Sequence, residues 1–122
     1  MGNHVVVLES DPGIARTLAG KLSTHFHAVL LTRSGDEFRE RVEQQRPQAV
    51  VVDVEYSRLT EVQNLHREFP ELPIVCTHRI PDEQLWIEAM DAGASDVCRS
   101  DDTQDVLNSV LRQVALSHGA VA

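Results

Sequence analysis

The chain has 122 residues and a formal net charge of −8, and hydrophobic residues make up 42% of it. This length and composition are typical of one globular domain, so we predict that residues 1–122 form a single domain without disulfides or structural metals. The negative charge disfavours direct binding to nucleic acid and to anionic membranes, because both would repel the chain.

Strand-like and helix-like segments alternate through the first half of the chain. Short apolar runs that predict strands lie at 4–8, 28–31 and 49–53. Asp11 is a typical N-cap and begins a helix after the first strand, and Ser34 does the same after the second. The third run is rich in valine, which indicates a strand buried on both faces, and it ends on a carboxylate, Asp53.

The alternation continues through the second half. The predicted elements there are a helix over 59–69, a strand over 73–77, a helix over 81–92, a strand over 95–98 and a last helix that begins at Asp101 or Asp102. Gly93 is placed to end the helix over 81–92, because glycine readily adopts the left-handed conformation that terminates helices.

Five strand–helix units with short connections indicate a parallel sheet covered by helices on both faces, a three-layer α/β/α sandwich. Ligands bind such sheets beyond the carboxyl ends of the strands. Polar residues stand at or just after four predicted strand ends: Glu9, Ser10, Asp53, His78, Arg79, Arg99 and Ser100. Each alone is compatible with a solvated loop, but the set indicates a site at one edge of the sheet.

Three segments, in this order and spacing, resemble the receiver domain of bacterial two-component response regulators. They are VVVLESDPGI, RPQAVVVDV and LPIVCTHRIPDEQLWIEAMDAGASDVCRS. The resemblance covers nearly all of the chain. It implies a doubly wound, flavodoxin-like sheet with strand order 2-1-3-4-5, and a signalling module rather than an enzyme.

The resemblance gives Asp53 a chemical role, because this residue aligns with the phosphate acceptor of the family. A carboxylate acts there as the nucleophile toward a phosphoryl group, in a relay in which a histidine kinase is the partner. Mg²⁺ neutralises the incoming charge, and Glu9 and Asp53 would be its ligands here. Only these two clear carboxylates remain, so we expect Mg²⁺ binding to be weak.

Several positions that hold the metal or the phosphate depart from the family pattern. The family has an acid, a threonine, a small residue, an aromatic residue and a lysine where this chain has, in that order, Ser10, His78, Arg79, Val97 and Ser100. These losses favour a pseudo-receiver that acts through protein–protein contacts. The alternative is a conventional receiver phosphorylated on Asp53. A flavodoxin-like ligand binder or enzyme is disfavoured, because the acidic segment ESDPG would repel phosphate.

Two arginines and a histidine lie near the predicted position of Asp53. Arg79 or Arg99 is expected to pair with the Asp53 carboxylate in place of the missing cations, unless both are solvated loop residues. His78 is expected to be either a neutral hydrogen-bonding group or a pH-sensitive one.

The predicted partner surface includes Trp86, Ile87 and Val97, on the fourth helix and the fifth strand. Family members commonly use the fourth helix, fifth strand and fifth helix for dimerisation and target contact, so a homodimer through this face is one expectation. The N-terminus lacks the basic region of a secretion signal, and no apolar run is long enough to span a membrane, so the expected compartment is the cytoplasm.

Overall fold

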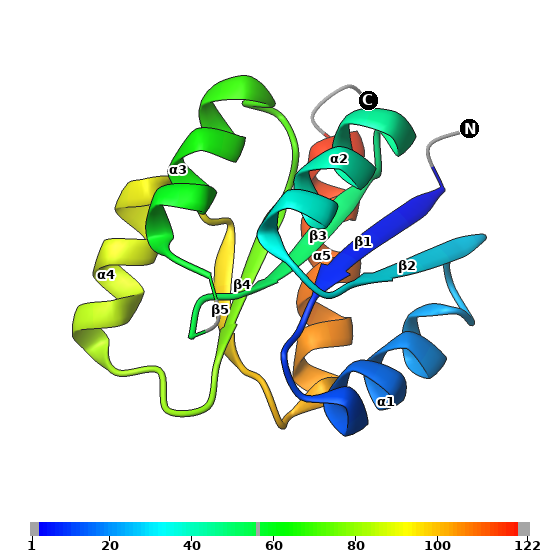
Figure 1. Ribbon diagram of the computed structural model, residues 1–122, viewed down its shortest axis with the longest axis horizontal. Coiled ribbons are helices and arrows are strands. Elements are labelled where there is room, and N and C mark those ends of the chain that lie inside the picture. The colour runs from blue at the N-terminus through cyan, green and yellow to red at the C-terminus, as the bar shows by residue number, and fades with distance from the viewer. Residues whose placement is uncertain (1–2, 56, 120–122) are drawn as a thin grey trace.

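The computed structural model describes residues 3–55 and 57–119, which form five strands that alternate with five helices (Figure 1). In chain order they are β1 (His4–Leu8), α1 (Pro12–Leu22), β2 (Ala28–Thr32), α2 (Gly35–Gln45), β3 (Ala49–Asp53), α3 (Leu59–Glu68), β4 (Ile74–His78), α4 (Glu83–Ala92), β5 (Asp96–Arg99) and α5 (Thr103–Gly119). The predicted elements are confirmed to within a few residues at each boundary. No helix among these residues is long and apolar enough to cross a bilayer.

The five strands form one parallel sheet in the order β2-β1-β3-β4-β5, which confirms the predicted flavodoxin-like topology. Alternate residues of the central strands enter two separate cores. Val5, Val7 and Val51 pack with α1 and α5 on one face, whereas Val6 and Val50 pack with α2, α3 and α4 on the other. Figure 1 shows the sheet between these two helical layers.

The helix ends follow the capping residues of the sequence. The Asp11 side chain accepts hydrogen bonds from two amides of the first turn of α1, and Asp82 accepts one from the amide of Leu85 in α4. Helix α4 therefore begins at Glu83, two residues after the predicted start, because Asp82 is its N-cap. Asp102, and not Asp101, caps the start of α5, because its carboxylate accepts a hydrogen bond from the amide of Asp105.

Gly93 ends α4 in the left-handed conformation, with φ of 116°. A Cβ atom at this position would lie 2.4 Å from Cγ of His66 on α3. Glycine is therefore required both by the backbone conformation and by the close approach of α3 to the end of α4. The turn directs the chain into β5, whose carboxyl end lies at the candidate site.

Candidate functional site

A cavity of about 500 Å³ opens at the carboxyl ends of the strands, where the sequence predicts a site. Residues after β1 form much of its wall, and the others come from β3, the loops after β3 and β4, and the residue that follows β5. The lining residues are Glu9, Ser10, Asp11, Pro12, Ile14, Asp53, Glu55, Arg79 and Ser100. Five of the seven predicted site residues thus line one cavity, and His78 and Arg99 do not.

Asp53 lies at the end of β3 and is only 2% exposed, although it is a carboxylate. Ser10 donates to its Oδ2 through the hydroxyl, at 2.8 Å, and through the backbone amide, at 3.3 Å. The amide of Glu55 donates to Oδ1 at 2.9 Å. A buried carboxylate usually requires hydrogen-bond donors or a cation as partners. Here the three donors provide hydrogen bonds to both oxygens of Asp53 without a cation.

Glu9 is the second carboxylate of the site, and its environment favours the neutral form. Burial raises the pKa of Glu9 to about 7, and the negative charge of Asp53 raises it further. The hydrogen bond from the Asp11 amide acts in the opposite direction and lowers the pKa, but its effect is smaller than that of burial. A large fraction of Glu9 is therefore protonated at neutral pH. A metal ion would have to displace that proton, which weakens binding.

The predicted ion pair between Asp53 and an arginine is wrong. Arg79 pairs with Glu55 instead, with 3.1 Å between Nε and Oε2, and Arg99 pairs with Asp101 at 2.9 Å. Both guanidinium groups are largely exposed, at 76% and 62%, so neither loses much hydration. Reaching the buried Asp53 would have required that loss, whereas Glu55 and Asp101 are more exposed and pair with the two arginines near the surface.

Glu55 is a residue of the site that the sequence analysis missed. Its carboxylate accepts from the amide and the guanidinium of Arg79, and these contacts lower the pKa of Glu55. Glu55 thus remains charged and joins the loop after β3 to the loop after β4. The sequence feature that could have identified Glu55 as a site residue is its position, two residues after Asp53.

Two hydroxyl groups near the end of the sheet are buried without a hydrogen-bond partner in the described part of the chain. Ser100, at the position of the family's lysine, is 3% exposed and lines the cavity. Thr77 is 1% exposed and lies beside Asp53 in the register of β3 and β4. His78 follows it, and its Nδ1 accepts a hydrogen bond from the Ile80 amide.

The residues present do not fit a dedicated Mg²⁺ site. Within residues 3–55 and 57–119, no three His, Cys, Asp or Glu side chains are grouped closely enough to hold a metal ion. Glu9 is partly protonated at neutral pH, and Ser10 supplies a hydroxyl where the family has an acid. Mg²⁺ gives up its water reluctantly and needs well-placed oxygen ligands, so this set of donors predicts weak binding.

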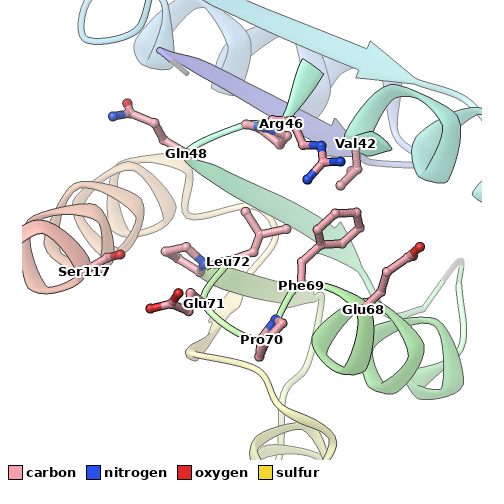
Figure 2. A pocket seen from close by; sticks show the side chains of 11 residues that line it. Val42, Arg46, Gln48, Glu68, Phe69, Pro70, Glu71, Leu72 and Ser117 are labelled. Atoms are coloured by element: carbon pink, nitrogen blue, oxygen red, sulfur yellow. The ribbon is translucent and has the colours of Figure 1, made fainter. Parts of the chain in front are cut away.

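A second cavity, of about 370 Å³, lies at the opposite end of the sheet and has no residue in common with the first (Figure 2). The Phe69 ring points toward Val42 and Arg46, and the Arg46 guanidinium lies 5.5 Å from the ring centroid. Arg46 adopts a left-handed backbone conformation, with φ of 48°, at the end of α2. This cavity is therefore not an extension of the Asp53 site.

The predicted partner surface is exposed in part. Trp86 and Ile87 on α4 are 47% and 43% exposed, so both side chains are available for contacts. Val97 on β5 is half-buried and packs against the core beneath α4, so only part of its side chain is exposed for contact with a partner.

The fold resembles those of solved receiver domains. A CheY-like receiver domain from Methanospirillum hungatei JF-1 superposes with a TM-score of 0.85 and 12% identity, over 96% of this chain and 97% of that one. The BeF3-activated DrrB receiver domain gives 0.81 and 21%, over 93% and 98% of the two chains. NtrX from Brucella abortus gives 0.80 and 20% over 97% of this chain, which spans only 28% of NtrX.

No protein-family model and no curated protein matches the chain. The family resemblance therefore depends on the fold and on the three segments named in the sequence analysis. The chain has the five-stranded, doubly wound fold of response-regulator receiver domains.

Proposed function

We propose that this chain is a pseudo-receiver, a two-component signalling domain that acts through protein–protein contacts without Mg²⁺-dependent phosphorylation of Asp53. The environment of Asp53 is the observation that carries the proposal. Its carboxylate is buried and is satisfied by Ser10 and by the Glu55 amide. A histidine kinase or another signalling protein is the partner class, and the domain itself is not an enzyme.

Electrostatics supports this proposal. Two unit charges ~4 Å apart interact by ~4 kcal/mol at an effective dielectric constant of ~20. The family's lysine and one of its metal-binding acids are replaced here by Ser100 and Ser10, which are both neutral. Losing both interactions lowers the affinity for a phosphoryl group by several powers of ten. Arg79 does not compensate, because it pairs with Glu55.

A conventional receiver phosphorylated on Asp53 is the second candidate, and the Ser100 hydroxyl is the observation that favours it. This hydroxyl is buried, lines the cavity and has no partner among the described residues, so it is free to donate to a phosphoryl oxygen. In that case Glu9 and Asp53 would hold Mg²⁺ weakly. Activation could then act on a homodimer through α4, β5 and α5.

Titration with beryllofluoride and Mg²⁺, followed by amide NMR, separates the two candidates. The DrrB receiver domain has been described in the BeF3-activated state, so the mimic suits this fold. We expect no saturable shifts at the amides of Ser10, Glu55 and Ser100 at millimolar Mg²⁺. Saturable shifts in the wild type that disappear in the control variant Asp53→Asn would establish the conventional receiver instead.

A further inference from the structure

The cavity at the amino-terminal end of β3 is separate from the Asp53 site and has no part in the proposed function (Figure 2). Its volume of about 370 Å³ lies within the range of about 300–1,000 Å³ in which proteins bind small molecules. The end of α2, the residues before β3, the loop between α3 and β4, and one residue of α5 line it. The cavity is therefore large enough for a small organic ligand.

Apolar side chains make up much of the lining. Val42 is fully buried and belongs to the core, and Phe69 and Leu72 pack against that core while they remain partly exposed. Three prolines complete the apolar part of the wall: Pro47, Pro70 and Pro73. Because proline has a fixed φ, these positions lose little conformational freedom when a ligand binds. The apolar surface of the cavity is thus largely preformed.

Arg46 supplies a positive charge beside this apolar surface. Its guanidinium lies 5.5 Å from the centroid of the Phe69 ring. Across residues 3–55 and 57–119, no carboxylate forms an ion pair with Arg46, although Glu68 and Glu71 also line the cavity. Figure 2 shows these two side chains on either side of Phe69 and apart from the guanidinium. The charge of Arg46 is therefore available to an anionic ligand.

The backbone of Arg46 is a second, independent observation that points to a function. Arg46 has φ of 48° and ψ of 61°, and among the residues that the structure describes it is the only one besides glycine with positive φ. Glycine or asparagine is usual where a helix ends in this conformation, because a larger side chain is strained there. Such strain is concentrated at functional sites, and the end of α2 does not require an arginine. The side chain of Arg46 thus has a use that offsets the strain.

We propose that this cavity binds a small apolar carboxylate, such as an aromatic acid. The carboxylate accepts two parallel hydrogen bonds from the planar guanidinium of Arg46, and the apolar part of the ligand packs on Phe69, Leu72 and the prolines. Because the guanidinium is already held against an aromatic ring, it loses less freedom when it binds. The proposal goes beyond the pseudo-receiver and does not depend on it, since the two cavities share no residue.

A ligand with an amino group is the alternative, because Glu68 and Glu71 carry negative charges. Both side chains are exposed, so water and salt screen their charges. Neither makes a contact that holds its carboxylate at the apolar wall, whereas the cation–π contact holds the guanidinium of Arg46 against Phe69. The cavity therefore favours the apolar carboxylate over an apolar amine.

Three probes with the same apolar body test the class of ligand: phenylbutyrate, its neutral amide phenylbutyramide, and phenylbutylamine. Amide NMR of the whole chain follows Arg46, Gln48 and Leu72, which lie in the cavity wall. We expect phenylbutyrate to give saturable shifts at these amides at millimolar concentration, phenylbutyramide to bind about ten-fold more weakly, and phenylbutylamine to give no saturable shift. Equal affinity for the acid and the amide would overturn the proposal, as would tighter binding of the amine or the absence of saturable shifts with all three probes.

Matched variants test whether Arg46 is the group that binds the carboxylate. Arg46→Asn removes the guanidinium, and asparagine tolerates the left-handed conformation, so the Tm should stay close to that of the wild type. Phenylbutyrate should bind to this variant about ten-fold more weakly. The control Arg67→Gln removes an exposed arginine of α3 that does not line the cavity, and should leave the affinity within about two-fold. Equal weakening in both variants would indicate general charge attraction and overturn the proposal, as would unchanged binding in Arg46→Asn.

The two glutamates of the lining provide a test of sign. Glu68→Gln/Glu71→Gln removes two negative charges from the cavity wall without changing Arg46 or Phe69. If the ligand is a carboxylate, the removal of these like charges should strengthen phenylbutyrate binding about two-fold. Weaker binding of phenylbutyrate in this double variant would overturn the proposal.

Discussion

Replacing Ser10 by aspartate returns a second acid to the end of β1, beside the buried carboxylate of Asp53. In the wild type the Ser10 hydroxyl donates to Oδ2 of Asp53 at 2.8 Å. Ser10→Asp removes this donor and introduces a negative charge in its place. We expect the variant to be less stable than the wild type without metal, and to recover stability when Mg²⁺ is added.

The size of both effects follows from the geometry. A hydrogen bond to a charged group contributes about 1.5–3 kcal/mol, and a like charge ~4 Å away adds up to ~4 kcal/mol of repulsion at an effective dielectric constant of ~20. Protonation of one acid relieves part of the repulsion, so we expect the free energy of unfolding to fall by about 2–4 kcal/mol at pH 8. Mg²⁺ at ten times its dissociation constant returns about 1.4 kcal/mol, or about 5 °C in Tm.

Thermal unfolding followed by circular dichroism, with and without Mg²⁺, measures both effects. Ser10→Asn is the matched control, because it has nearly the size of aspartate without the charge and should show no response to Mg²⁺. Adding Asp53→Asn to Ser10→Asp should abolish the response. A wild type that Mg²⁺ stabilises as much as it stabilises Ser10→Asp would refute the idea that Ser10 excludes the metal.

Three further predictions concern stability. Gly93→Ala should destabilise the fold by about 2 kcal/mol or more, since alanine is strained at φ of 116° and its Cβ would clash with His66. The control is Gly20→Ala, whose added Cβ lies in open space within α1. It should stabilise the fold by about 0.5–1 kcal/mol, and urea unfolding measures both variants. The pKa of Glu9 is about 7 in the folded chain against 4.5 ordinarily, so the folded state binds more protons between these values and loses stability as pH rises from about 4.5 through 7. Glu9→Gln should abolish this part of the pH dependence, and an unchanged profile would contradict the raised pKa. Asp96→Asn should lower the free energy of unfolding by about 1–2 kcal/mol, because the Asp96 carboxylate on β5 accepts hydrogen bonds from Ser109 and Arg112 of α5. The control Asp101→Asn breaks only the exposed pair with Arg99, so chemical denaturation should show almost no change.

The order of elements and the parallel three-layer architecture could be predicted because local signals and the apolar pattern agree, whereas the strand order 2-1-3-4-5 was implied by the resemblance to receiver domains. Asp11 and Ser34 cap the helices they were expected to cap, and Gly93 adopts the left-handed conformation expected of it. The alternation of β1 and β3 residues between two cores follows from the period of two in strands. These features depend on residues close together in the chain, so they could be predicted from the sequence.

The contacts of loop side chains at the site could not be predicted in the same way. The position of Asp53 follows from the strand, but the choice of Arg79 between Asp53 and Glu55 depends on the paths of two loops and on the cost of dehydrating a guanidinium. The raised pKa of Glu9 depends on how deeply the loop after β1 buries it. Arg46 gave no signal of its left-handed conformation, because that conformation is usually adopted by glycine or asparagine.

The most direct test of the central claim is phosphorylation of the chain by a small-molecule donor. The wild type is incubated with acetyl phosphate and millimolar Mg²⁺, and its intact mass is measured before hydrolysis can remove an aspartyl phosphate. A conventional receiver domain treated in parallel is the positive control. The pseudo-receiver predicts no phosphoryl adduct on the wild type. A near-stoichiometric adduct that is absent from Asp53→Asn would contradict it.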